Sequence, residues 1–105
     1  MDKLLTATML EQGELRIPTT ARFTGQKIPI PAVLKLRFGG SSLGVAVVRA
    51  PRDIAHFMRE WQHYGDILAQ QYVQGQEFTC SVLEEHGIPK ALPVIQIIPR
   101  TTFFD

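Results

Sequence analysis

Two periods of apolar residues run along the chain, one typical of helices and one typical of strands. A first helix is predicted over residues 2–12, where Asp2 can cap the first turn and Gly13 ends the helix. A second helix is predicted to begin at Pro51 and to end before Gly65. Its apolar residues recur at helical spacing and form one stripe: Ile54, Phe57, Met58 and Trp61.

Short apolar runs of strand length surround the second helix. Ala32–Leu36 and Val45–Val48 flank a glycine-rich loop, and three further strands are predicted at residues 67–73, 77–83 and 90–98. Residues 16–31 contain prolines that exclude a central strand, so we expect a connecting loop there with at most a short edge strand. The pattern predicts an α+β fold with a mostly antiparallel sheet of about four to five strands and two helices.

Strict alternation marks the run at residues 77–83. It places one polar and one apolar set on opposite faces of the strand, and these sets are Glu77, Thr79 and Ser81 against Phe78, Cys80 and Val82. We expect the apolar face to pack on a helix and the polar face to meet a polar ligand. Cys80, the only cysteine, is then expected to be a buried, small apolar residue.

Composition narrows the classes of function. The chain has 105 residues, 45% of them hydrophobic and 20% charged, which is typical of one globular domain. A net charge of +1 with scattered Lys and Arg argues against a nucleic-acid partner. No stretch approaches the roughly 18 apolar residues that cross a bilayer, and no signal peptide is evident, so we expect a cytoplasmic protein without a membrane partner.

Metal and nucleophile patterns are not evident in the sequence. The three histidines, His56, His63 and His86, lack a partner at the spacing of metal ligands, and we expect them on the surface. No grouping typical of a catalytic triad is present. The sequence itself therefore predicts no metal site within this chain.

Three features could bind an anion or a sugar. The loop at residues 38–44 could close backbone N–H groups around phosphates or could be a plain hairpin turn. Lys35 lies in an otherwise apolar strand, where it needs an anionic partner unless it occupies the solvent face of an edge strand. Glu77 could accept hydrogen bonds from two ribose hydroxyls or could be an exposed strand carboxylate. Lys3 alone would be read as a solvated helix residue.

Six ordered segments, which span nearly the whole chain, resemble the central region of D-alanine–D-alanine ligases, a family of ATP-grasp enzymes. They are Met1-Asp2-Lys3, Arg16-Ile17-Pro18-Thr19, the strand ending in Lys35, the loop Gly40-Ser41-Ser42-Leu43-Gly44, residues 67–79, and residues 92–105. The resemblance implies an ATP-grasp subdomain that supplies one wall of a cleft, because such enzymes hold the nucleotide between two sheets.

The resemblance also implies roles for individual residues. Lys3 and Lys35 would contact the ATP phosphates beneath the lid loop, and Glu77 would bind the ribose. Ser41 would orient the D-alanine substrate, and Gln70 stands where an acidic residue normally meets the adenine amino group. The implied ATP-binding residues are Lys3, Lys35, Gly40, Ser41, Ser42, Gly44, Gln70, Gln71, Tyr72, Val73 and Glu77.

The chain also departs from the pattern of the family. Leu36 replaces a usual proline, while Gly39 and Gln96 replace frequent glutamates. The substrate domain of the family is expected before Met1, and the magnesium-binding carboxylates and an oxyanion-stabilising arginine are expected after Asp105. We therefore expect residues 1–105 to be a partial ATP-grasp domain, with ATP as cofactor and Mg²⁺ held by residues outside the chain.

The implied reaction is ATP-dependent joining of two D-alanine molecules through an acyl phosphate, a step of peptidoglycan precursor synthesis. Full-length members of the family are expected to be homodimers. A sister ligase that makes D-alanyl-D-lactate or D-alanyl-D-serine is the alternative within the class. A non-catalytic module that binds a nucleotide or a partner, or a decayed remnant, is the alternative outside it.

Overall fold

The computed structural model describes residues 1–39 and 43–98. The chain divides into two compact units, Met1–Val73 and Gln74–Asp105, and each is considered by itself.

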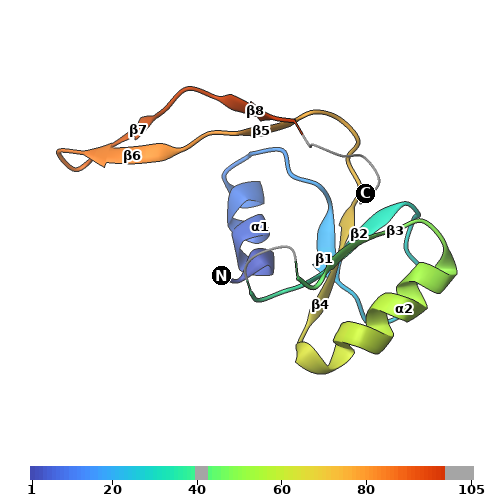
Figure 1. Cartoon of the computed structure of the whole chain (residues 1–105). Coiled ribbons are helices and arrows are strands. Elements are labelled where there is room, and N and C mark those ends of the chain that lie inside the picture. Colours follow the sequence, from blue (N-terminus) through green and yellow to red (C-terminus); the bar gives the residue numbers. More distant parts are fainter. Residues whose placement is uncertain (40–42, 99–105) are drawn as a thin grey trace. The chain divides into compact units, whose positions relative to one another are not determined.

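The first unit is built on a four-stranded, fully antiparallel sheet with the strand order β1-β4-β2-β3. Figure 1 shows this sheet between the two α-helices. The strands are β1 (Thr20–Arg22), β2 (Ala32–Leu36), β3 (Val45–Val48) and β4 (Ile67–Gln71). The helices are α1 (Lys3–Gln12) and α2 (Pro51–Trp61), the latter continued by a 3-10 turn, η1 (Gln62–Tyr64). The predicted α+β class and the short edge strand in the proline-rich segment are confirmed.

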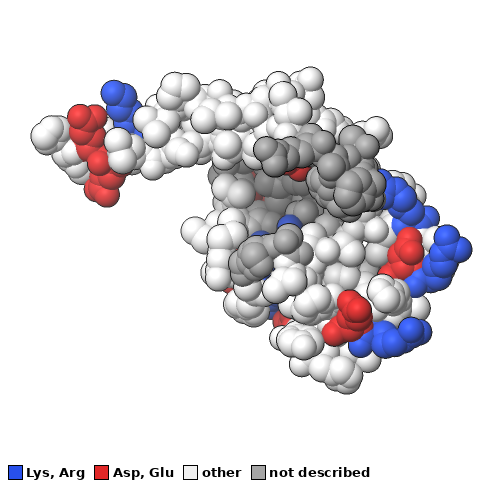
Figure 2. Space-filling view, in the orientation of Figure 1, with Lys and Arg blue, Asp and Glu red and all other residues white. Residues whose placement is uncertain are grey.

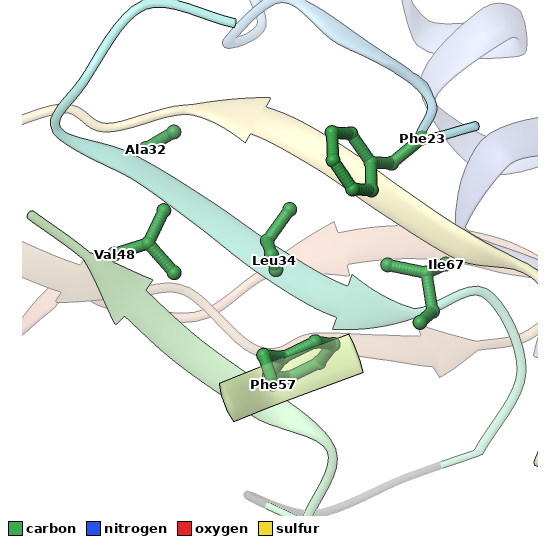
Figure 3. Close-up of a cluster of buried hydrophobic side chains, with 6 residues drawn as sticks. All are labelled: Phe23, Ala32, Leu34, Val48, Phe57 and Ile67. Carbon is green, nitrogen blue, oxygen red and sulfur yellow. The ribbon is translucent and has the colours of Figure 1, made fainter. Parts of the chain in front are cut away.

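The core of this unit lies between α2 and one face of the sheet. Leu34 and Val48 are fully buried and Phe57 is 2% exposed. Burying a side chain of this size contributes roughly 1.5–3 kcal/mol. The predicted apolar stripe of α2 is confirmed, because its other members pack against the buried cluster. The buried cluster, drawn in Figure 3, comprises Phe23, Ala32, Leu34, Val48, Phe57 and Ile67.

Strand alternation turns a second set of residues toward the other face of the sheet. In β2 this set includes Lys35, whose neighbour Leu34 points into the core. Lys35 pairs with Leu68, and Gln70, two residues further along β4, lies on the same face. Because β2 pairs with β4 on one side and β3 on the other, it is a central strand. The alternative that placed Lys35 on an edge strand is wrong.

The second unit consists of two antiparallel strand pairs, β5 (Glu77–Thr79) with β8 (Ile95–Ile97) and β6 (Val82–Glu85) with β7 (Ile88–Ala91). The continuous strands predicted at residues 77–83 and 90–98 are therefore each interrupted. At the interruption, the Leu92 N–H donates to the Ser81 carbonyl at 2.9 Å, outside the regular ladders.

Burial in the second unit differs from the prediction. All residues from 74 to 98 are exposed, among them Phe78 at 55% and Val82 at 67%. The expectation that Phe78, Cys80 and Val82 form a packed apolar face is wrong, and so is the expectation of a buried Cys80, whose thiol is exposed. Alternation in a sequence predicts which side chains share a face, whereas burial also needs a second layer, and paired strands alone provide none.

Among the described residues, no helix is long and apolar enough to cross a membrane.

Candidate functional site

The face of the sheet opposite the core, called the polar face, carries Lys35, Gln70 and Thr20. The ammonium group of Lys35 donates a 3.0 Å hydrogen bond to Oε1 of Gln70, and Nε2 of Gln70 donates to Oγ1 of Thr20 at 2.9 Å. Lys35 is half-buried. Desolvation, and then repulsion from Lys3, lower the pKa of Lys35 from its ordinary value of 10.5. The sequence predicted an anionic partner for this lysine, but the group it hydrogen-bonds is a neutral amide.

Lys3 brings a second cation to the same face. The ammonium group donates to the carbonyl oxygen of Gly39 at 2.7 Å, and the backbone N–H of Lys3 donates to the carbonyl of Arg37 at 3.0 Å. Lys3 lies close enough to depress the pKa of Lys35 by repulsion. The hydrogen bonds of both ammonium groups go to uncharged oxygens. Two adjacent cations whose hydrogen bonds go to uncharged oxygens are suited to a ligand with several negative charges.

The first turn of α1, which carries Lys3, is fixed by an ion-pair network. The Asp2 carboxylate caps the helix by accepting from the N–H groups of Leu4 and Leu5, each at 3.1 Å, so the predicted cap is confirmed. Arg37 donates two hydrogen bonds to the same carboxylate, from Nε at 2.9 Å and from a terminal nitrogen at 3.0 Å. These bonds lower the pKa of Asp2 to about 2.

Arg37 extends the network to β4. Its other terminal nitrogen lies 3.2 Å from Asp66, which is also 3.3 Å from Arg22. Sequence reasoning found the cap at Asp2 but missed Arg37. No local signal could have found it, because Asp2 and Arg37 are 35 residues apart and a charged residue after a strand is ordinarily solvated.

The glycine-rich loop is described at its two ends. Gly44 has a φ of +69°, which favours glycine, and a side chain at this position would meet the Leu36 side chain at 2.6 Å. The Leu36 N–H donates to the Gly44 carbonyl at 2.8 Å. Proline, usual at position 36 in the family that the sequence resembles, has no N–H to make this bond. Gly40, Ser41 and Ser42, predicted to cover the phosphates, lie outside the described residues.

The end of β4 and the two residues after it, Gln71, Tyr72 and Val73, are among the ATP-binding residues that the resemblance implies. The guanidinium of Arg49 lies over the ring of Tyr72, 5.6 Å from its centre. Gln71 is the last residue of β4, and its N–H donates to the Thr19 carbonyl at 2.8 Å. Tyr72 is half-buried, and Val73, which ends the first unit, is exposed.

A cavity of about 360 Å³ opens beside β1 and β4, a volume at the lower end of small-molecule sites. Gln70 and Gln71 contribute to its wall, and the rest is mostly apolar, including Ala21, Ile28, Pro29 and Pro31. Neither Lys3 nor Lys35 lines this cavity. The lysine pair therefore does not form this cavity.

Glu77, predicted to bind the ribose, lies in the second unit at the start of β5, where it is exposed and pairs with Ile97. Gln96 lies opposite Phe78 in the same ladder. The ribose-binding role of Glu77 stays a prediction.

Metal ligands do not gather in the part of the chain that the structure describes. No group of three His, Cys, Asp or Glu side chains is positioned there to hold an ion. His56, His63 and His86 are exposed, as predicted.

On the face drawn in Figure 2, acidic side chains lie beside basic ones, and the two signs are interspersed.

Comparison with known proteins gives a consistent result. A family model described as D-ala D-ala ligase C-terminus matches residues 7–105. The D-alanine–D-alanine ligase of Thermotoga sp. strain RQ2 is 33% identical over 109 residues, which cover 99% of this chain and 36% of that protein. The ligase of Fervidobacterium nodosum is 32% identical over 81 residues, which cover 76% of this chain and 26% of that protein. The chain therefore spans about a third or less of the length of these relatives.

A solved structure is similar in fold. The D-alanine–D-alanine ligase of Bacillus anthracis complexed with ATP superposes with a TM-score of 0.74 at 21% identity, covering 98% of this chain and 36% of that one. The ATP-grasp fold expected from the sequence is confirmed.

Proposed function

Because the chain belongs to the D-alanine–D-alanine ligase family, we propose that it is the ATP-binding part of an enzyme that joins two D-alanine molecules. The family supports a ligase, and the solved relative with ATP supports a nucleotide as the ligand. Residues 1–105 would form a partial ATP-grasp domain, and the rest of the enzyme would complete the active site.

The observation that carries this proposal is the lysine pair. Lys3 and Lys35 lie close together on the polar face of the sheet, beside the glycine-rich loop, and their hydrogen bonds go to uncharged oxygens. An ammonium that repels its neighbour gains the most from an added anion. The triphosphate of ATP would supply that anion, and Gln70 would present its amide to the base.

The proposed reaction has two steps. A carboxylate oxygen of the first D-alanine attacks the γ-phosphorus of ATP, and the bond to the bridging oxygen breaks so that ADP leaves. The amine of the second D-alanine then attacks the acyl carbon, phosphate departs, and the amine loses a proton. Lys3 and Lys35 would stabilise the phosphate charge in the first step, and Ser41 would orient the D-alanine.

The proposal extends to the pathway, the compartment, the oligomeric state and the metal ion of the enzyme. The product would serve peptidoglycan synthesis in the cytoplasm, in an enzyme that is homodimeric. Magnesium would neutralise ATP when bound. Since the described residues offer no cluster of carboxylates, we assign no residue of this chain to the metal.

A graft tests the function. The segment of the Thermotoga ligase that matches this chain would be replaced by residues 1–105, and D-alanine-dependent phosphate release from ATP would be measured. We expect a folded graft to turn over, and Lys35→Met to lower kcat/KM on the order of a hundredfold. Arg52→Gln, an exposed charge change on α2, is the control and should have no effect.

Two results would count against the proposal. A folded graft that binds ATP but never releases phosphate would favour the non-catalytic binding module. A graft whose turnover is unchanged by Lys35→Met would remove the lysine pair from the site.

A further inference from the structure

Helix α1 meets the rest of the unit with its first half, where Lys3, Leu4, Thr6 and Ala7 are half-buried. None of its ten residues is buried, and the exposed residues include all of those from Thr8 to Gln12. An isolated helix of this length is marginal in water, so its position depends on what holds it. The half-buried residues Asp2 and Lys3 lie at the end that meets β2.

Arg37 holds that end of the helix through an ion pair with Asp2. The guanidinium makes the two parallel bonds that fit a carboxylate, at 2.9 and 3.0 Å to Asp2, and both side chains are mostly shielded, at 24% and 21% exposure. The Arg37 carbonyl also accepts from the Lys3 N–H at 3.0 Å. One residue therefore fixes both the cap of α1 and the backbone of Lys3.

We propose that Arg37 is a positioning residue for the lysine pair: by gripping Asp2 and the Lys3 backbone, it holds the Lys3 ammonium beside Lys35. What the pair binds rests on the proposed function, but the position of Lys3 does not. Arg37 itself would not touch the ligand. Asp66 anchors the guanidinium from the β4 side at 3.2 Å, so the grip on Asp2 is braced by the sheet.

The test uses the pKa of Lys35 as a measure of where Lys3 lies, because repulsion from Lys3 lowers it. The pKa would be measured by NMR titration of the lysine side chains in the 105-residue chain at constant low ionic strength. Lys3→Met defines the rise caused by losing Lys3. Arg37→Lys keeps the charge but cannot form the bidentate hydrogen bonds to Asp2. We expect this variant to raise the pKa of Lys35, as Lys3→Met does.

The double variant separates position from direct charge effects. If Arg37 acts through Lys3, then Lys3→Met with Arg37→Lys should give no further rise beyond Lys3→Met alone. Arg22→Lys is the matched control, since Arg22 bonds Asp66 but not Asp2, and it should leave the pKa of Lys35 unchanged. Additive rises, or an unmoved pKa in Arg37→Lys, would overturn the positioning role.

Amide exchange gives a second, independent readout. In Arg37→Lys the N–H groups of Leu4 and Leu5 should exchange about tenfold faster, because the cap that they bond is loosened. Exchange in the core strand β2 should not change. Asp2→Asn, which keeps a capping side chain but loses the ion pair, should reproduce the pKa change of Arg37→Lys. The proposal would be refuted if, in both variants, the Leu4 and Leu5 amides exchanged as slowly as in the wild type and the pKa of Lys35 did not change. Failure of the graft to turn over would refute only the proposed function.

Discussion

The Lys35 ammonium donates to the Oε1 atom of Gln70 at 3.0 Å, so a cation on a central strand is hydrogen-bonded to a neutral amide. The amide satisfies a donor but does not neutralise the charge. Lys35 therefore remains electrostatically unfavourable in the free chain, as its lowered pKa indicates.

Replacing Gln70 by glutamate should remove that imbalance. In Gln70→Glu, a carboxylate would lie at hydrogen-bond distance from the ammonium and should raise the pKa of Lys35. NMR titration of the lysine side chains would measure the change. Gln71→Glu, at the neighbouring exposed position, is the matched control and should have a much smaller effect. Equal rises in the two variants would mean that the Lys35–Gln70 contact does not persist in solution.

Asp2 should make the stability of the chain depend on pH in the acid range. In the folded chain its pKa is about 2, below the ordinary 3.8, so the folded state holds this proton less tightly than the unfolded state does. The stabilisation is complete above about pH 4 and is lost as the pH falls through about 2. Asp2→Asn should therefore lose less stability than wild type over that window.

Urea unfolding at several pH values between 2 and 7 would measure this difference. Glu11→Gln, an exposed change in the same helix, should follow the wild type. A wild-type curve that is parallel to that of Asp2→Asn across the whole range would contradict the assigned role of the ion pair.

Gly44 should tolerate a side chain poorly. Its φ of +69° costs an L-residue about 1–2 kcal/mol, and the new Cβ would also lie 2.6 Å from the Leu36 side chain. We expect Gly44→Ala to lower the free energy of unfolding by at least that amount in chemical denaturation. Gly13→Ala is the control: φ there is −81° and the nearest atom is 3.5 Å away, so its effect should be near zero or stabilising. Equal stabilities would argue against this loop geometry.

The 105-residue chain alone should not make a dipeptide, and should bind ATP weakly if at all, with a Kd weaker than about 1 mM. It spans 36% of the Thermotoga relative and would supply one wall of the cleft, so a bound nucleotide would stay hydrated on its other side. Phosphate release with D-alanine, ATP and magnesium, together with calorimetry, would test this with and without the following segment of that relative. D-alanine-dependent turnover by the chain alone would show that the partial-domain proposal is mistaken.

The sequence predicted local structure well where one period dominates. The apolar stripe from Ile54 to Trp61 specified α2, and the runs at 32–36 and 45–48 specified the β2–β3 hairpin, because each element is set by neighbours in sequence. Lys35 stood out for the same reason, since a cation interrupts an apolar run.

Burial and side-chain pairing could not be predicted in this way, because they depend on parts of the chain that are distant in sequence. Alternation at residues 77–83 suggested one strand; Phe78 lies in β5, but Cys80 lies in the break between β5 and β6. The exposure of both residues depends on whether another layer covers them. Arg37 pairs with Asp2 across 35 residues, and the surroundings of Arg37 in the sequence predict only a solvated charge. The prediction that Lys35 needs an anion overlooked Gln70, because the register between β2 and β4 is not encoded in either strand alone.

The strand order also bears on how the first unit assembles. Strands β2 and β3 form a hairpin from sequence neighbours, but β4 must insert between β1 and β2, and the Thr20–Gln70 contact closes a separation of 50 residues. Such closure is entropically costly and slows folding relative to local pairing. We expect the hairpin and α2 to associate first and β4 to enter last. The surface that presents Lys35 beside Gln70 would then exist only after the slowest step, so a partly folded chain would have its hairpin but not the face that we propose to bind the nucleotide.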